Sequence, residues 1–442
     1  MIAEVPFSEL LSAVIDNRGK TCPTADSGIP LIATNCIRNE LLYPTYDKVR
    51  FVSKETYANW FRGHPLPGDI IFVNKATPGR VSLVPDPVDF CIAQDMVAVR
   101  ANPKRVYPNY LFAVLRSPAV QEKISQMHVG TLIPHFKKGD FDKLLLPIPE
   151  PEEQEFIGDT YFELSAKIDA NRRMNATLEV MARALFQSWF VDFDPVRAKL
   201  DGRPPAALDP TTAALFPSSF DETEVGHIPH GWTVTTLGEA CENGGGNIQT
   251  GPFGTQLHAS DYVDEGIPSI MPSDLRDNRI DASSIARIRE QDAERLKVYR
   301  VQAGDVVYSR RGDVERRSLI RRGEHGWLCG TGCLRVRFGP RGLNPFFGAS
   351  YLGTLESRAW VVRHAVGATM PNLNTSILGA LPTIVPPPEL QARFAEIVGP
   401  WDQRGTIALE QSRTLATLRD TLLPKLLSGE IATSIPEPTQ SL

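Results

Sequence analysis

The sequence predicts an α+β protein built as a pseudo-twofold internal repeat. Two mixed, β-rich domains are each followed by one long helix, and the two helices are expected to pair as an antiparallel coiled coil. Two observations carry this prediction: short motifs recur about 237 residues apart, and a heptad pattern of apolar residues follows each copy. With 442 residues and 42% apolar content, the chain is long enough to build two or three cores.

Four motifs mark the repeat. In chain order they are Gly28-Ile29-Pro30 with Gly266-Ile267-Pro268, Gly68-Asp69 with Gly304-Asp305, the run Val129–Pro134 with Val366–Pro371, and Pro151-Glu152-Glu153-Gln154 with Pro388-Glu389-Leu390-Gln391. Their order is the same in both copies. The duplication therefore covers whole domains and the start of each helix.

Residues 1–150 and 227–386 are expected to be the two β-rich domains. Short β-branched or aromatic runs, separated by Gly, Pro and Asn turns, predict strands at Asp69–Val73, Met96–Val99, Val306–Tyr308 and Leu334–Phe338. Longer helical stretches are expected at Tyr110–Gln126 and Phe346–His364.

Residues 151–190 and 387–430 are expected to be the long helices. Steps of three and four residues place one stripe on each helix. The first stripe is Ile157, Tyr161, Leu164, Ile168, Asn171, Asn175, Leu178, Ala182, Leu185 and Trp189, and the second is Leu390, Phe394, Ile397, Trp401, Arg404, Ala408, Gln411, Leu415, Leu418 and Leu422. Both stripes are polar in the middle, so antiparallel pairing would set Asn171 and Asn175 opposite Arg404 and Gln411. Residues 191–226 form an acidic, Pro-rich linker, and residues 431–442 are expected to be a flexible tail.

The net charge of −5 is unevenly distributed. Residues 1–150 carry 17 Lys and Arg against 15 Asp and Glu, and residues 226–386 carry 18 against 16, whereas residues 151–225 carry 7 against 14. Residues 300–341 hold ten Arg against four acids. The acid therefore lies in the helices and linker, and the repeated domains are slightly basic.

The composition also bears on the compartment. The chain has no run of 18 apolar residues, and its first residues carry neither a basic segment nor an apolar segment of a secretory signal. The six cysteines are scattered and predict no disulfide framework. The expected location is the cytoplasm. A molecule with twofold symmetry and basic domains fits a twofold partner, for which duplex DNA is the candidate.

The chain resembles the DNA specificity subunit of type I restriction–modification systems. The residues that carry the resemblance are Ala184–Pro195 after the first helix, Leu423–Ile431 after the second, and Gln249-Thr250-Gly251-Pro252-Phe253-Gly254 and Ser309–Val314 in the second domain. The resemblance implies two target-recognition domains that each read one half of a split DNA site, with a coiled coil that sets the unread gap between the halves.

The resemblance also implies partners. Two adenine-N6 methyltransferase subunits would dock on this chain, and translocating nuclease subunits would join when the complex restricts DNA. S-adenosylmethionine, ATP and Mg²⁺ would belong to those partners, and this chain itself would be non-catalytic with no cofactor.

Catalytic and metal-binding motifs are incomplete in this sequence. Arg18-Gly19-Lys20-Thr21 resembles the end of a phosphate-binding loop, but Val14 stands where the leading glycine belongs. Asn344-Pro345-Phe346-Phe347 departs from the adenine-methyltransferase motif because Phe346 replaces its second proline. Pro85-Asp86 lacks the downstream acid-x-Lys of a metal-dependent nuclease. His325, Cys329 and Cys333 lack a second pair that would complete a zinc site.

Two further functions stay open as alternatives. One is a stand-alone methyltransferase or nuclease with diverged motifs, and the other is a coiled-coil scaffold without DNA sequence preference.

Base reading needs bidentate donors on supported loops, while phosphate contacts need only cations or backbone N–H groups. The candidate DNA contacts in the first domain are Asn74, Lys75, Thr77, Arg80, His135, Lys137 and Lys138. Those in the second domain are Gln249, Thr250, Arg310, Arg311, Arg316, Arg317, Asn372 and Asn374. The alternative for these residues is a solvated charge or, for Asn372 and Asn374, a turn cap.

A partner surface is expected where the helices end. The candidate residues are Trp189, Phe190, Phe193, Leu426 and Leu427, which could form an apolar surface for the methyltransferase subunits. The alternative is that the aromatic residues close the coil against the adjacent domain.

Overall fold

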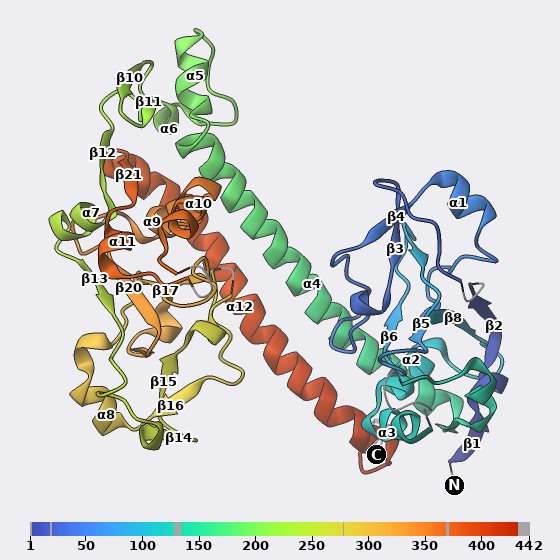
Figure 1. Cartoon of the computed structure of the whole chain (residues 1–442). Coiled ribbons are helices and arrows are strands. Elements are labelled where there is room, and N and C mark those ends of the chain that lie inside the picture. Colours follow the sequence, from blue (N-terminus) through green and yellow to red (C-terminus); the bar gives the residue numbers. More distant parts are fainter. Residues whose placement is uncertain (1, 18–19, 128–133, 277, 368–370, 432–442) are drawn as a thin grey trace, which may run out of the picture. The chain divides into compact units, whose positions relative to one another are not determined.

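The computed structural model describes residues 2–17, 20–127, 134–276, 278–367 and 371–431. Its contacts divide the chain into two compact units: unit 1 comprises Met1–Asn175 and Gly405–Leu442, and unit 2 comprises Ala176–Arg404 (Figure 1). Each unit holds one β-rich domain and one part of each long helix, which confirms the predicted fold class. The expected tail falls outside the described residues from 432 onward, as do residues 18–19 and parts of the repeated runs 129–134 and 366–371.

Unit 1 is built on a four-stranded sheet of order β2-β8-β5-β6 and a three-stranded sheet of order β4-β3-β7, with β1 paired to β9. Its strands are β1 (Ala3–Pro6), β2 (Leu11–Asp16), β3 (Ile29–Ile32), β4 (Arg50–Val52), β5 (Ile70–Val73), β6 (Val81–Leu83), β7 (Cys91–Ile92), β8 (Met96–Ala101) and β9 (Leu145–Ile148). Its helices are α1 (Lys54–Asn59), α2 (Pro108–Arg116) and α3 (Pro118–Met127), after which the long helix α4 (Pro151–Phe190) begins.

Strand β5 is buried on both faces, which explains why all four of its residues are apolar. Ile70 and Phe72 point into a cluster shared with α2 and α4, whereas Ile71 and Val73 point into a cluster shared with β3 and β7. Side chains alternate along a strand, so the four-stranded sheet is the middle layer between the second sheet and the helices. Each of these fully buried side chains contributes about 1.5–3 kcal/mol.

Unit 2 repeats this plan. A sheet of order β13-β20-β17-β18 forms the middle layer, and a sheet of order β14-β16-β15-β19 covers one face of it. Strand β12 pairs with β21. Its strands are β10 (Phe220–Thr223), β11 (Gly226–Pro229), β12 (Thr233–Thr236), β13 (Asn247–Thr250), β14 (Tyr262–Val263), β15 (Ile267–Ile270), β16 (Ala286–Ile288), β17 (Val306–Ser309), β18 (Arg317–Leu319), β19 (Leu328–Cys329), β20 (Cys333–Arg337) and β21 (Pro382–Val385). Its helices are α5 (Asp194–Leu200), α6 (Pro210–Ala214), α7 (Leu237–Asn243), α8 (Glu290–Arg295), α9 (Pro345–Tyr351), α10 (Leu355–His364), α11 (Thr375–Gly379) and the start of α12 (Pro388–Leu427).

Each predicted domain helix is two helices in the structure. The stretch predicted at Tyr110–Gln126 breaks at Ser117, because the proline that follows holds Ser117 in an extended conformation, with ψ of 142°. The stretch predicted at Phe346–His364 breaks before α10, where the Thr354 side chain accepts from the Ser357 N–H as an N-cap. Both copies break at corresponding positions.

The repeated Gly-Asp motif has the same structural role in both units. Asp69 is buried and accepts from Arg100 of the neighbouring strand β8 at 2.8 and 3.0 Å, and it also accepts from the Leu66 N–H. Asp305 does the same with Arg337 of β20, at 2.8 and 2.6 Å. The preceding glycine is left-handed in both copies, with φ of +83° at position 68 and +95° at position 304. The motif is therefore a brace of the middle sheet.

The repeated glutamine attaches each long helix to its domain. Gln154 accepts from the Tyr107 N–H at 2.9 Å and donates to Pro149 O at 2.7 Å. Gln391 accepts from the Asn344 N–H at 2.9 Å and donates to Pro386 O at 2.8 Å. Both side chains are buried, so each satisfies two backbone groups that water cannot reach.

The two long helices are antiparallel in each unit. In unit 1, Asn171 donates to Ala408 O at 3.3 Å and to Gln411 Oε1 at 3.0 Å, while Arg419 donates to Ser165 Oγ at 3.4 Å. In unit 2, the rings of Phe186 and Phe394 lie 5.5 Å apart. The expected contact between Asn171 and Gln411 is present.

The second stripe differs from the prediction after Trp401. Arg404 and Leu418 are exposed, and Gly405 and Arg419 are buried in their place. The stripe takes a step of four residues where a step of three was expected, which moves the buried face by one position. No helix within the described ranges is long and apolar enough to cross a membrane.

The acidic linker after α4 is itself folded. It contains α5, α6 and β10, and β10 pairs with β11, which begins at the last linker residue. Asp209 caps α6 by accepting from the Thr212 N–H at 3.0 Å. Val196 and Phe216 of this segment are buried in the core of unit 2.

Candidate nucleic-acid interface

Unit 2 carries several of the predicted contact residues at one end of its middle sheet, here called the loop end of unit 2. Strand β17 ends there at Ser309 and β13 ends there at the half-buried Thr250, because these residues pair with the first two residues of β20. The Arg310 N–H then donates to Gly332 O at 2.7 Å. The chain therefore leaves both strands on the same side of the domain.

A second segment of unit 2 is bonded to this loop end. The Leu373 N–H donates to Arg310 O at 2.8 Å, and Arg311 forms an isolated antiparallel bridge with Asn372. Leu373 is fully buried, so it anchors the segment in the core. The arginine pair and Asn372, which are distant in the sequence, consequently share one surface.

Unit 1 has the same arrangement at its own loop end, formed by residues 74–80 and 134–138. The Phe136 N–H donates to Asn74 O at 2.8 Å, Lys75 forms a bridge with the half-buried His135, and the Asn74 N–H donates to Asp95 O at 3.0 Å. Phe136 is fully buried and takes the anchoring position that Leu373 has in unit 2. The two loop ends thus share one backbone scaffold.

The cations of the unit 1 loop end face solvent. Arg80 and Lys137 are exposed, Lys75 is partly exposed, and the exposed Lys138 forms an ion pair with Asp16 at 2.8 Å. An exposed ion pair contributes little to stability, so Lys138 can exchange Asp16 for a phosphate at small cost.

The loop end of unit 2 presents arginine and amide groups. Arg311 is exposed, and the exposed Arg316 forms an ion pair with Asp313 at 2.9 Å. Two atoms beside them, Arg310 Nε and Asn372 Oδ1, are buried and have no hydrogen-bond partner among the described residues. An unsatisfied donor and an unsatisfied acceptor at one surface suit a polar ligand.

One predicted contact residue, Arg317, is part of the interior of unit 2, and another, Gln249, is half-buried and hydrogen-bonded within the unit. Arg317 is only 7% exposed in β18, and its guanidinium lies where a side chain at Gly353 would stand. Gln249 accepts from Arg335 Nη2 at 2.7 Å, on the face of the sheet opposite to Thr250. Burial lowers the pKa of Arg335 below its usual value. The burial of Arg317 corrects the expectation that its side chain faces DNA, whereas the DNA contact of Gln249 stays a prediction for a side chain that already accepts from Arg335.

Two more predicted residues have local structural roles, and a third, Thr77, has a buried hydroxyl with no hydrogen-bond partner among the described residues. Asn74 is buried and donates to Phe136 O at 3.0 Å, so its side chain fastens the two loops together. Thr77 Oγ1 is shielded from solvent. Asn374 accepts from the Ile377 N–H at 2.7 Å and caps α11, which is the alternative role that the sequence left open.

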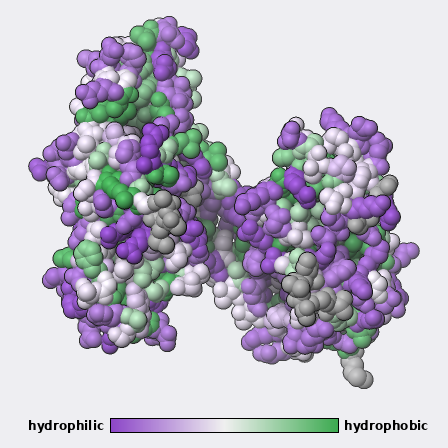
Figure 2. Space-filling model, viewed as in Figure 1, coloured by the Kyte–Doolittle hydropathy of each residue, from purple (hydrophilic) through white to green (hydrophobic). Residues whose placement is uncertain are grey.

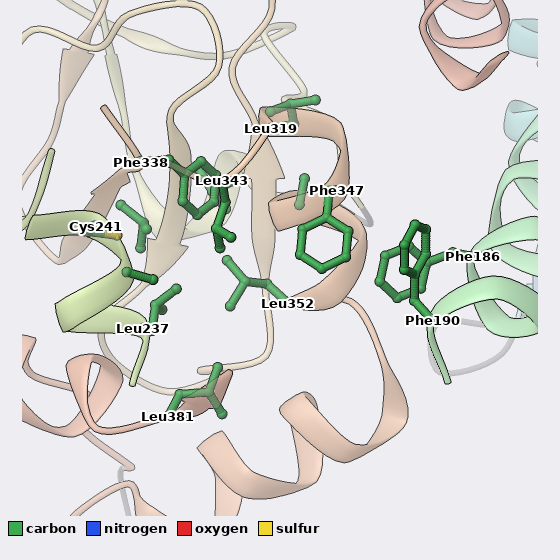
Figure 3. Packing of buried hydrophobic residues seen from close by; sticks show 14 of the residues in the cluster. Phe186, Phe190, Leu237, Cys241, Leu319, Phe338, Leu343, Phe347, Leu352 and Leu381 are labelled. Carbon is green, nitrogen blue, oxygen red and sulfur yellow. The ribbon is translucent and has the colours of Figure 1, made fainter. Parts of the chain in front are cut away.

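The aromatic residues at the end of α4 are buried, which corrects the expectation that they form an exposed partner surface. Trp189, Phe190 and Phe193 belong to the core of unit 2. The rings of Phe190 and Phe347 lie 5.0 Å apart, and Figure 3 shows Phe186 and Phe190 pointing from α4 toward Phe347. These residues close the helix pair against the domain, because an aromatic side chain gains most free energy when its whole surface is covered.

Leu426 and Leu427 lie in the corresponding place in unit 1. Leu426 is buried in the core of that unit, and Leu427 is partly buried against it. The surface of the visible face is mostly hydrophilic, with scattered hydrophobic patches (Figure 2). Leu426 is therefore not part of an exposed apolar surface, and Leu427 is exposed only in part.

The cysteines and His325 do not form a metal-binding cluster among the described residues. All six cysteines are buried free thiols, and burial raises the pKa of Cys329 to about 12. His325 is exposed, and its Nδ1 accepts from the Ala303 N–H at 3.5 Å. Over the described ranges, no group of three His, Cys, Asp or Glu side chains has a metal-binding arrangement.

The residues that position the loop ends were not predicted from the sequence to belong to the site. Asp69 and Asp305 brace the strands that lead into the loops, and Phe136 and Leu373 anchor the second segment of each loop end. The repeat itself contained the signal for the two aspartates, since both follow the duplicated glycine.

The chain is similar to proteins of one class, the specificity subunits of type I restriction enzymes. A family model described as the type I restriction modification DNA specificity domain matches residues 17–180. The HindI specificity subunit of a type I restriction enzyme from Haemophilus influenzae is 27% identical over 413 aligned residues, covering 82% of this chain and 86% of that protein. The MjaIX specificity subunit from Methanocaldococcus jannaschii is 21% identical over 366 aligned residues, covering 82% and 78%.

A solved structure shares the fold. The crystal structure of the S subunit of a type I restriction–modification system from M. genitalium matches with a TM-score of 0.58 at 17% identity, over 96% of each chain. In its duplicated domains, its antiparallel helices and these relatives, the chain is similar to the DNA specificity subunits of type I restriction–modification systems.

Proposed function

We propose that this chain is the DNA-recognition component of a type I restriction–modification complex and that each unit reads one half of a split site. One observation carries the proposal: the two units present different side chains on the same loop scaffold. Lys75 and His135 occupy in unit 1 the places of Arg311 and Asn372 in unit 2. A shared scaffold with different polar groups is what two different half-sites require.

The side chains at the loop ends suit the chemistry of duplex DNA. An arginine can donate two hydrogen bonds to guanine, and an asparagine can pair with adenine, in the major groove. Arg310, Arg311 and Asn372 are therefore our candidates for base contacts in the second half-site. Lys75, Lys137 and Lys138 are point charges, which suit phosphate contacts in the first half-site.

The reaction itself belongs to partner subunits in this proposal. Two adenine-N6 methyltransferase subunits would supply the S-adenosylmethionine chemistry and flip the target adenine out of each strand. Restriction and translocase subunits, with ATP and Mg²⁺, would join the same complex. The complex would work in the cytoplasm. The contribution of this chain is to position those partners on DNA.

The partner surface in this proposal is on the exposed faces of the long helices, because Trp189, Phe190, Phe193 and Leu426 near the helix ends are buried. Val180 and Met181 on α4 are 59% and 43% exposed, and Ile407 and Leu418 on α12 are 51% and 44% exposed. A partner subunit that covered these side chains would remove apolar surface from water, as the core of a protein–protein interface does.

The test is a map of methylated adenines in the source strain, with and without this gene. We expect a split motif, methylated on both strands at a fixed gap, that disappears on deletion. Complementation with Arg310→Ala/Arg311→Ala should relax or abolish recognition of one half only, with a loss of about 1–3 kcal/mol for each base contact removed. An unchanged methylome, in cells with an intact methyltransferase partner, would contradict the proposal.

A further inference from the structure

An aromatic side chain stands exposed at the loop end of unit 2. Phe253 is 57% exposed and lies in the loop that follows β13. Its neighbours in that loop are Gly251, Pro252 and Gly254. Single exposed apolar residues are common on protein surfaces, so the exposure of Phe253 needs a second observation before it indicates a ligand.

The first half of this loop is fixed to the sheet. The Gly251 N–H donates to Cys333 O at 2.9 Å, and Thr331 Oγ1 donates to Pro252 O at 3.2 Å. A side chain at Gly251 would place its Cβ only 2.1 Å from Gly330 O, so only glycine allows this approach. The residue before Phe253 is therefore held in place by the backbone beside it.

The second half of the loop is fixed through Gln256. The Phe253 N–H donates to Gln256 Oε1 at 3.2 Å, and the Gln256 N–H donates back to Phe253 O at 2.8 Å. Gln256 is held in turn by Tyr299 Oη at 3.0 Å and by Arg295 Nη1 at 2.9 Å. The loop is thus fastened on both sides of an aromatic residue that itself faces solvent.

The position of the loop gives the second observation. The Gly330–Gly332 turn that supports Pro252 also accepts from the Arg310 N–H at 2.7 Å. Phe253 therefore belongs to the same end of the sheet as the arginine pair and Asn372. A pre-ordered aromatic group beside cationic and amide groups is the combination that proteins use against nucleic-acid bases.

We propose that Phe253 packs against the bases of the second half-site when the chain binds duplex DNA. The proposal rests on the function proposed above. A phenyl ring has no hydrogen-bonding group, so its contact is with a thymine methyl group or with a base step that it partly unstacks, and not with phosphate. Fastening the loop before binding lowers the ordering entropy lost in the complex.

The test uses the full chain with its methyltransferase partner and a duplex that carries the methylated split motif. Affinity is measured for wild type, Phe253→Ala, Phe253→Trp and Arg310→Ala/Arg311→Ala over a range of salt concentrations. Phe253→Ala should weaken binding about 10-fold, while Phe253→Trp keeps most of it. The salt dependence should stay that of wild type in both Phe253 variants, because no phosphate contact is lost.

Two controls separate a base contact from a change in folding. Val225→Ala removes another apolar side chain of unit 2, 47% exposed in the turn of the β10–β11 hairpin, and should bind as wild type. A duplex with a scrambled second half-site should show no difference between wild type and Phe253→Ala.

The proposal for Phe253 fails if Phe253→Ala binds the cognate duplex as tightly as wild type, or if it weakens both duplexes equally. If Arg310→Ala/Arg311→Ala still loses the second half-site in that case, the function proposed for the chain stands and only the role of Phe253 is rejected. If both variants keep the preference of wild type for the second half-site, the role of Phe253 and the function proposed for the chain are both rejected.

Discussion

The two units differ most where their chemistry faces outward and least where the domain meets its helix. Gln154 and Gln391 make the same pair of buried hydrogen bonds, and the Asp69–Arg100 brace is repeated as Asp305–Arg337. At the loop ends, by contrast, the scaffold is kept and the side chains change. The comparison teaches that the duplicated part of the sequence encodes attachment and support, and that the loops were free to change in each copy.

One buried arginine shows how far the two copies can change without losing the fold. In unit 1, Arg116 of α2 donates to the backbone carbonyl of Val81 at 2.8 Å. Val81 pairs with Phe72 as Arg317 pairs with Tyr308 in unit 2, so Val81 and Arg317 are equivalent positions. In unit 2 the arginine is on the strand instead of the helix: the Arg317 side chain extends from β18 toward Gly353, just after α9. Each unit buries one guanidinium in this region, but the two come from opposite elements.

The largest effect is expected from substitutions at the two buried arginines, Arg116 in unit 1 and Arg317 in unit 2. Arg116→Ala should lower the free energy of unfolding of unit 1 by about 4 kcal/mol, because it leaves buried carbonyl groups without a donor and creates a cavity. In unit 2, Gly353→Ala should be destabilising by itself, since the new Cβ would lie 2.1 Å from Arg317 Nη2. Adding Arg317→Val to Gly353→Arg should recover much of the loss by recreating the arrangement of unit 1.

Amide hydrogen exchange of β5 and β17 measures the two units separately. Protection should fall in β5 alone for Arg116→Ala and in β17 alone for the Gly353 variants. If the double variant is no more stable than Gly353→Arg, the two arginines are not equivalent.

A smaller and equal effect is expected in both units from the repeated glutamine. Gln154→Ala and Gln391→Ala should each destabilise their unit by about 3 kcal/mol, because two backbone groups lose a buried partner. Urea unfolding followed by hydrogen exchange of the same strands measures both. Gln403→Ala is the matched control, since Gln403 is an exposed glutamine of α12 and should have almost no effect. A clear difference between the two variants would show that the attachment is not the same in both copies.

The smallest effect concerns one turn at the loop ends. Ala76 has φ of +70° and Gly312 has φ of +75° at the equivalent position. Glycine adopts this left-handed conformation without steric cost. Ala76→Gly should therefore stabilise unit 1 by about 1 kcal/mol, and Gly312→Ala should destabilise unit 2 by about the same amount. Thermal unfolding of both variants checks the opposite signs, and two changes of the same sign would contradict the equivalence.

The sequence was sufficient for the repeated architecture because its signals are local and duplicated. The heptads predicted the paired helices, and the Gly-Asp and Pro-Glu-x-Gln motifs predicted where each copy begins a strand or a helix. The one-residue shift after Trp401 could not be predicted, because the heptad pattern does not decide which of two adjacent positions, Arg404 or Gly405, is buried.

The candidate interface was only partly predictable. Short loops after the predicted strands identified Arg310 and Arg311 as candidate contacts, and both lie at the loop end of unit 2, where Arg311 is exposed and Arg310 Nε is buried. The sequence could not distinguish these arginines from Arg317, because burial of a charged side chain depends on a distant glycine, Gly353. Likewise, the aromatic residues after α4 are buried by residues of a different domain segment, such as Phe347.

The strand pairs at the borders of the domains have a further consequence. β1 pairs with β9, and β12 pairs with β21, so each domain begins and ends on two adjacent antiparallel strands. The polypeptide therefore enters and leaves each domain at neighbouring points. Gene recombination with crossovers in these short strands could replace a whole domain as a cassette and leave the helix attachment intact. A lineage could in this way acquire a new recognition sequence in one genetic event, without passing through an unfolded intermediate form of the protein.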